Sequence, residues 1–348
     1  MAERKTNRRG NYTMLTGFSI VGILGFGALG IDISYISMAN TQAAAVSDAA
    51  SHAALLTFRQ APGNETTRQA LGTIAANWIV DNNNVGFDGP GTLESIEYGV
   101  FNSATGNFNP GSSPANAAKA QVTRTDGNGI ELMLAPILGI HRADIDQSGV
   151  TVANPREIVV VLDRSCSMNW GSPVSGQLGT DRALEAFSQY MVSHQVPLDR
   201  IGATWFSSNG GWWDNLRYIE GAEGAILTKW SSWDTETMSG STDQRDGIVP
   251  AHTALKNSGN DLAFKALIVI SDGNPNPSSL NSAFLNATAN AWADGIHVWT
   301  VAFGDSINDG LMQNATKGLG TYEKTPDSTG LSAVMLKIAE SIPVALVQ

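Results

Sequence analysis

The sequence predicts a mixed α/β protein with an N-terminal transmembrane helix, a small α+β middle domain, and a doubly wound, mostly parallel sheet. Three observations predict this fold class. No charged residue lies between Arg9 and Asp32, short β-like runs alternate with turn clusters over 63–155, and apolar strands alternate with helical segments over 156–348. A length of 348 residues leaves room for about two domains of ordinary size.

The composition excludes several classes of protein. Acidic residues outnumber Lys plus Arg by 32 to 21, giving a net charge of -11 that repels phosphate backbones, so we expect no nucleic-acid partner. The single cysteine, Cys166, excludes an internal disulfide and a multi-cysteine zinc site, and no disulfide-linked partner is expected. The sequence contains no nucleophile elbow, phosphate-binding loop or paired zinc histidines, so we expect no enzyme.

The first 38 residues predict a membrane anchor. Residues 1–10 form a basic N-terminus expected in the cytoplasm, and 11–38 form the transmembrane helix. The 22 uncharged residues would make a helix of about 33 Å, against a hydrocarbon core about 30 Å thick. The basic flank predicts a single pass through the cytoplasmic (inner) membrane, with the N-terminus inside and most of the chain on the extracytoplasmic side. A cleaved signal peptide, cut near Ser37-Met38-Ala39, is the alternative.

Asp32 follows the apolar run directly. A carboxylate in hydrocarbon is costly, so we expect Asp32 at the outer interface, or alternatively in a polar contact with a partner helix. After it, an Ala-rich helix extension is predicted over 39–62, because alanine is the best helix former and Pro62-Gly63 ends the pattern.

The N-terminal segment resembles TadE/TadG-like proteins. Arg9-Gly10-Asn11, a Gly-rich apolar run, Gly30-Ile31-Asp32 and the Ala-rich stretch carry the resemblance, which covers about the first sixty residues. It implies a role in a tight-adherence (Flp) pilus-assembly system of bacteria.

Residues 63–155 are expected to form the small α+β domain. Strands are predicted over 95–101, 118–125 and 143–153, and a short helix over 130–138. Over 156–348 the pattern changes to the alternation typical of an open α/β sheet. Strands are predicted there over 157–162, 200–206, 213–218, 265–270 and 297–303, and helices over 181–192, 222–230, 243–256, 279–294 and 330–341.

Oxygen-bearing side chains follow two of the buried strands. Asp163-Arg164-Ser165-Cys166-Ser167 comes after the first strand, Ser271-Asp272-Gly273 comes after the strand at 265–270, and Gly240-Ser241-Thr242-Asp243 opens a helix between them. Because ligands of such sheets bind at the carboxyl ends of the strands, we expect these loops to meet. Hydroxyl and carboxylate oxygens suit Mg²⁺ or another hard divalent cation such as Mn²⁺ or Ca²⁺.

These motifs resemble a von Willebrand factor type A domain with a metal-ion-dependent adhesion site. The resemblance covers about 156–348, with Asp163, Ser165 and Ser167 on its D-x-S-x-S motif, Thr242 on its distal threonine and Asp272 on its last aspartate. It implies that these five residues hold the metal and that a protein partner completes the shell with an Asp or Glu carboxylate.

Three tryptophans are candidates for a partner-binding rim. Trp170 follows the first metal loop, and Trp212 and Trp213 follow a turn expected at the same sheet edge. Local packing under the hairpin is the alternative.

Together, the predicted anchor and the two resemblances imply a membrane-anchored envelope protein for pilus assembly or cell adhesion. Two alternatives remain open: a metal-free scaffold of the envelope, and a secreted adhesin released by signal cleavage.

Overall fold

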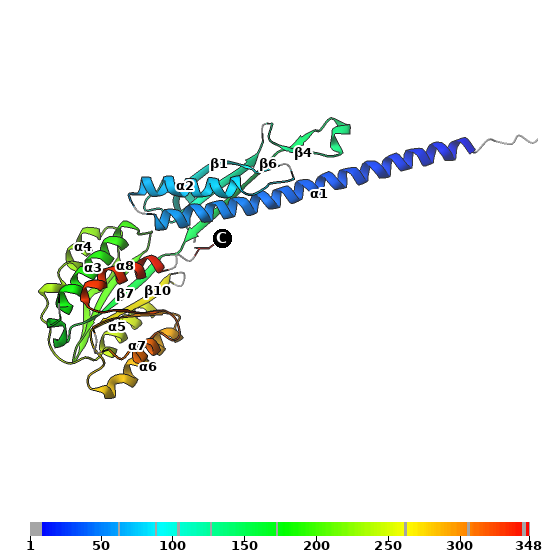
Figure 1. The fold of residues 1–348 in the computed structure, drawn as a ribbon. Helices are drawn as coiled ribbons and strands as arrows, with labels where there is room; N and C mark the ends of the chain where they lie inside the picture. Colours follow the sequence, from blue (N-terminus) through cyan, green and yellow to red (C-terminus); the bar gives the residue numbers. More distant parts are fainter. Residues whose placement is uncertain are drawn as a thin grey trace, which may run out of the picture. The chain divides into compact units, whose positions relative to one another are not determined.

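The structure, a computed structural model, describes residues 9–61, 63–87, 89–102, 105–125, 127–171, 173–260, 263–304, 307–342 and 346–347 (Figure 1). Most of the predicted cytoplasmic segment, 1–10, therefore lies outside the described residues. The chain divides into two compact units. The first holds the chain up to residue 98 together with 117–152, and the second holds 99–116 together with 153–347.

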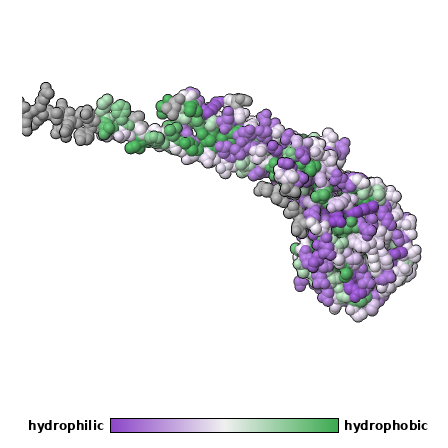
Figure 2. Space-filling model, turned by 180° about the vertical axis from the view of Figure 1, so that it is seen from behind, coloured by the Kyte–Doolittle hydropathy of each residue, from purple (hydrophilic) through white to green (hydrophobic). Residues whose placement is uncertain are grey.

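One helix, α1 (Arg9–Gln60), includes both the predicted membrane span and its predicted Ala-rich extension. Within the part of the chain that the structure describes, the segment Met14–Gln60 is long and apolar enough to cross a membrane. Apolar side chains in its N-terminal half are exposed, and Figure 2 shows this stretch as a largely apolar surface. From Asp32 onward one side is buried in the first unit, through Tyr35, Ala39, Ala43, Val46, Ala50, Ala54, Leu55 and Phe58.

A second helix, α2 (Glu65–Asp81), packs along α1 and was missed by the sequence analysis. The sequence did contain a signal for this helix, because Asn64 is a preferred N-cap residue. Its side chain accepts a hydrogen bond from the Thr67 amide at 2.9 Å. Gly72 allows the close approach of the two helices, since a Cβ there would lie 2.6 Å from the carbonyl oxygen of Ala54.

The strands of the middle region lie close to where they were expected. β1 (Thr92–Asn102), β3 (Ala117–Arg124) and β6 (Ile145–Ala153) belong to one sheet, with β3 and β6 antiparallel from Ala117↔Val152 to Arg124↔Ile145. β2 (Asn107–Pro110) pairs with the end of β1.

The prediction of a short helix over 130–138 is wrong. Instead, β4 (Ile130–Glu131) pairs with β5 (Arg142–Ala143), and only one turn of 3₁₀ helix, η1 (Ala135–Leu138), lies between them. Pro136 donates no backbone hydrogen bond and Gly139 is left-handed with φ 84, so no longer helix forms.

The second unit contains a six-stranded sheet in the order β12-β11-β10-β7-β8-β9. Every pairing is parallel except that between β8 and β9. Its strands are β7 (Arg156–Asp163), β8 (Arg200–Phe206), β9 (Gly210–Tyr218), β10 (Phe264–Ser271), β11 (His297–Phe303) and β12 (Tyr322–Thr325). Counted from β7 the order is 3-2-1-4-5-6, which confirms the doubly wound, mostly parallel fold.

Helices cover both faces of this sheet (Figure 1). One face packs on α3 (Gly176–Ser193), α4 (Glu223–Trp230) and α8 (Leu331–Ser341), and the other packs on α5 (Arg245–Lys256), α6 (Asn281–Ala293) and α7 (Asp309–Ala315). The remaining elements are η2 (Cys166–Asn169), η3 (Trp233–Thr235), η4 (Ser278–Leu280), η5 (Ser328–Gly330) and β13 (Leu346–Val347). The sequence analysis missed α7 and β12, which are short, and placed the start of α3 five residues late.

Candidate metal centre

The candidate site lies between β7 and β10, where the strand order of the sheet reverses. Such a switch point is where ligands bind in open α/β sheets. Asp163 ends β7 and Ser271 ends β10, and the two strands pair in parallel up to Leu162↔Ile270. Ser271 Oγ donates a hydrogen bond to Asp163 Oδ2 at 2.6 Å. Sequence reasoning had assigned no role to Ser271.

A chain of short contacts joins the two carboxylates. Ser165 donates to Asp163 Oδ1 from its amide at 2.8 Å and from Oγ at 2.5 Å. Ser165 Oγ lies 2.9 Å from Ser167 Oγ, and Ser167 Oγ donates to Asp272 Oδ1 at 2.8 Å. Four of the five predicted ligands are thus side by side, although they come from loops about a hundred residues apart.

When both carboxylates are ionised, the protons in this series of contacts are too few for its hydrogen bonds. Two serine hydroxyls carry two protons, and both are used by the bonds to Asp163 and Asp272. The third contact, between Ser165 Oγ and Ser167 Oγ at 2.9 Å, then has no proton. Adjacent oxygens of an octahedral shell with bonds of about 2.1 Å lie about 3.0 Å apart, so this separation suits two ligands of one cation.

Thr242 lies on a loop that is hydrogen-bonded to the loop after β7 and to the loop after β10. Cys166 donates its amide proton to the Gly240 carbonyl at 3.2 Å, and the amide of Asn276 donates to the Thr242 carbonyl at 2.8 Å. Thr242 is 6% exposed. The next two residues carry buried acceptors without a hydrogen-bond partner in the described structure, Asp243 Oδ1 and Gln244 Oε1.

The electrostatics of the site favour an added positive charge. Burial raises the pKa of Asp163 to about 7, and the nearby negative charge of Asp272 adds to this effect. Burial also raises the pKa of Asp272. The hydrogen bonds that the structure shows to these carboxylates come from hydroxyls and an amide, not from a basic side chain. Arg164 points elsewhere, with its guanidinium 4.7 Å from the centre of the Trp205 ring.

A pocket opens beside Asp272 and Ser167. It is also lined by Trp170, Asn274, Phe303 and Asp327. Trp170 is 68% exposed and lines this pocket, and its part in a partner-binding rim stays a prediction.

The other two tryptophans do not belong to that rim. Trp213 packs against the core on one face of the sheet, 5.2 Å from Trp233 between ring centroids, and its Nε1 donates to Glu236 at 2.8 Å. Trp212 packs against the core on the opposite face. Neighbouring residues of a strand point to opposite faces, so Trp212 and Trp213 cannot share one rim. The alternative of local packing holds for both.

Comparisons with known proteins give a family match for the N-terminal segment. Residues 10–61 match the model of a family described as putative Flp pilus-assembly TadE/G-like. A search of curated proteins finds no match.

Solved structures resemble half of the chain or more at low identity. BatB from Bacteroides thetaiotaomicron is 17% identical, with 53% of this chain and 98% of that chain covered and a TM-score of 0.42. A von Willebrand factor type A protein from Catenulispora acidiphila is 12% identical, with 71% and 48% covered and a TM-score of 0.43. Manganese-loaded TRAP protein from Plasmodium vivax is 16% identical, with 57% and 78% covered and a TM-score of 0.44. These values are too low to transfer a ligand or a partner to this chain.

Proposed function

We propose that this chain is a membrane-anchored envelope protein of a tight-adherence pilus system that binds a partner carboxylate through a divalent cation. The observation that carries the proposal is the contact chain from Asp163 through Ser165 and Ser167 to Asp272, at the switch point of the sheet. Its two carboxylates lack a basic partner in the described structure, and when both are ionised its hydroxyl protons are one too few. A divalent cation relieves both conditions.

The five predicted residues would contribute two kinds of oxygen ligand to the metal. Ser165, Ser167 and Thr242 offer neutral oxygens, while Asp163 and Asp272 offer charge directly or through bound water. A bound cation would supply positive charge toward an acidic group of a partner. Trp170, on the rim of the same pocket, offers that partner an exposed aromatic surface. Nothing in this arrangement requires bond making, so we propose no enzymatic activity.

The family match at 10–61 and the apolar helix support anchoring of the chain in a membrane. We propose the cytoplasmic (inner) membrane, with a single pass, the N-terminus inside and both units outside, because Lys and Arg gather before the apolar run.

The structure disfavours release by cleavage near Ser37-Met38-Ala39. That cut would remove Tyr35, whose ring stacks on Phe87 with centroids 5.0 Å apart and whose hydroxyl accepts from the Phe87 amide at 2.9 Å. Retention of α1 keeps these contacts.

Calorimetric titration of the full chain in detergent with MgCl₂ and MnCl₂ tests the metal. Wild type is expected to bind one cation, and D272N and T242A are expected to bind at least tenfold more weakly. E220Q, which removes an exposed carboxylate of the same unit, serves as the matched control and is expected to bind like wild type. Absence of binding by wild type would favour the metal-free scaffold instead.

A further inference from the structure

A loop of nine apolar residues, Leu132–Ile140, joins β4 to β5 in the first unit. It contains no polar side chain and is flanked by Glu131 and His141. Met133, Ile137 and Ile140 are 68%, 83% and 54% exposed. Several exposed apolar side chains on one loop are typical of a surface that another apolar surface covers.

Asp32 fixes this loop to α1. Its carboxylate is 3% exposed and accepts hydrogen bonds from the amides of Met133 at 2.8 Å, Leu134 at 3.0 Å and Ala135 at 2.5 Å. The carboxylate thus finds its partners within its own chain, where the sequence had suggested either the interface or another helix.

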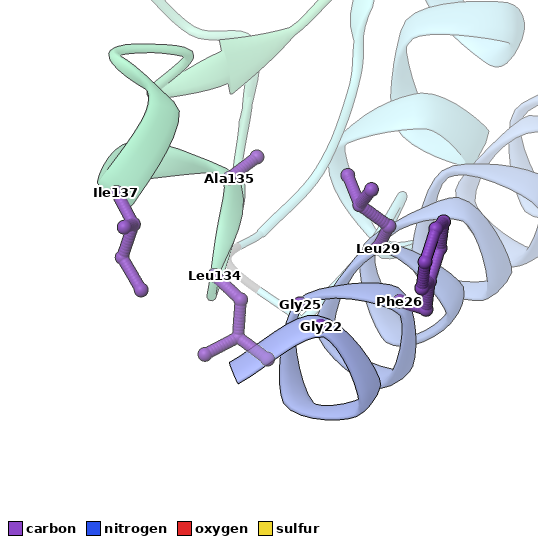
Figure 3. Close-up of a pocket in the computed structure, with 7 residues that line it drawn as sticks. All are labelled: Gly22, Gly25, Phe26, Leu29, Leu134, Ala135 and Ile137. Atoms are coloured by element: carbon purple, nitrogen blue, oxygen red, sulfur yellow. The ribbon is translucent and has the colours of Figure 1, made fainter. Parts of the chain in front are cut away.

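Beyond Asp32 the loop follows α1 toward its N-terminus. An apolar groove lies between the loop and the helix, lined by Gly22, Gly25, Phe26 and Leu29 of α1 and by Leu134 and Ile137 of the loop (Figure 3). These helix residues precede Asp32 by 3 to 10 positions, which is about 5 to 15 Å along the axis. They belong to the uncharged stretch that would cross the membrane, so the loop lies at the depth of that stretch.

Seven amides of the loop donate hydrogen bonds within the protein, which a lipid environment requires of backbone donors. Besides the three amides bound by Asp32, those of Leu132, Ile137, Gly139 and Ile140 donate to carbonyls of the same hairpin at 3.0 to 3.2 Å. Pro136 has no amide proton to place.

The polar residues of the hairpin lie at its opposite end. Glu131 and Arg142 form an ion pair at 3.0 Å on the paired strands, with side chains 69% and 43% exposed. Charged groups at the base and apolar groups at the end are the pattern of a segment that crosses from water into lipid.

We propose that residues 132–140 are a second membrane-embedded element, which enters the outer leaflet beside α1 and receives a lipid acyl chain in the groove. The occupant is lipid rather than protein because the loop continues the surface of the apolar helix at the same depth. The glycines leave that groove open, since a Cβ at Gly22 or Gly25 would meet no atom within 4 Å. The inference rests on the proposed anchoring by α1.

Depth-dependent fluorescence quenching tests the proposal. The full chain carrying C166S is labelled with an environment-sensitive fluorophore at I137C, F26C or A70C and reconstituted into phosphatidylcholine–phosphatidylglycerol vesicles. Phe26 is 80% exposed on α1 and reports on the anchor, while Ala70 is exposed on α2 and is the aqueous control. Nitroxides on the lipid chains are expected to quench the labels at 137 and 26 at least threefold more than the label at 70, with the reverse order for aqueous iodide.

The outcomes separate the loop from the anchor. Lipid quenching at 26 with iodide quenching at 137 would overturn the loop proposal and leave the anchor intact. Iodide quenching at both positions would overturn both. A label at M133C repeats the measurement at a second exposed position, and an unchanged thermal transition in detergent excludes unfolding as the cause.

Discussion

Ser167 Oγ donates a hydrogen bond to Asp272 Oδ1 across 2.8 Å, although the two residues are separated by 105 positions in the sequence. This contact closes the loop after β7 onto the loop after β10 and brings a second negative charge toward the buried Asp163. Two buried carboxylates placed in this way are electrostatically unfavourable without a cation, and the first prediction follows from that.

The variant D163N is predicted to separate metal binding from stability. Removing the buried charge relieves its repulsion with Asp272, so the metal-free variant is expected to unfold at or above the wild-type temperature. Wild type gains about 2.7 kcal/mol at a cation concentration a hundred times Kd, or roughly 5 to 10 °C in Tm, and D163N gains none. Thermal unfolding with and without 10 mM MgCl₂ checks this. An equal rise in Tm for D163N would contradict the assignment.

The variant D32A is predicted to destabilise the first unit. Three amides of the loop lose their acceptor and Asp32 is buried, so the free energy of unfolding is expected to fall by about 3 kcal/mol. Limited proteolysis and thermal unfolding in detergent measure it. D81A, which removes an exposed aspartate at the end of α2, is the control and should lie within about 0.5 kcal/mol of wild type. Cleavage rates equal to those of wild type within 132–140 would rule out the role of Asp32.

Loss of one buried ion pair is predicted to lower the free energy of unfolding of the second unit strongly. Arg156 and Asp199 are 2% and 1% exposed, with Nη2 and Oδ2 2.6 Å apart, and Asp199 also accepts from the amide of Val196. D199A leaves a buried guanidinium unpaired and is expected to cost about 3 to 5 kcal/mol. The pair Lys337–Glu323 gives the contrast, because Lys337 is 65% exposed and K337A should cost less than about 1 kcal/mol. Similar losses in chemical denaturation of D199A and K337A would show that burial does not decide the effect.

The stability of the second unit is predicted to depend on pH through His297. Burial against Phe264 and Trp299 lowers the pKa of His297 in the folded state. Below its ordinary value of about 6.5, the unfolded chain binds a proton that the native state does not, so folding stability falls as the pH falls. H297F removes this contribution. Between pH 7.5 and 5, wild type should therefore lose more stability than H297F, and parallel pH profiles would refute the prediction.

The sequence predicted the second unit well because its signals are local and strong. The apolar runs at β7 and β10 are buried on both faces, and the Asp163 and Asp272 loops follow them directly, so topology alone brings these loops together. The position of the candidate site between β7 and β10 could therefore be predicted from the order of the elements, without a measured distance.

Other features depend on tertiary contacts that no local pattern contains. The apolar run at 130–138 resembles a helix, but Pro136, Gly139 and the anchoring of its amides by Asp32 hold it as a hairpin. Trp212 and Trp213 are adjacent in sequence and point to opposite faces once the strand forms. The mismatch between hydroxyl protons and contacts at Ser165 and Ser167 becomes visible only when distances are known.

The continuity of α1 has a mechanical consequence. Its exposed apolar stretch and its buried stretch are successive turns of one helix, without a glycine–proline break between Asp32 and Gln60. Helices commonly adjust to bilayer thickness by tilting. Because α1 continues from its exposed apolar stretch into the core of the first unit, a change in the tilt of the helix rotates that core as well. The orientation of the first unit is therefore expected to change with the thickness of the membrane.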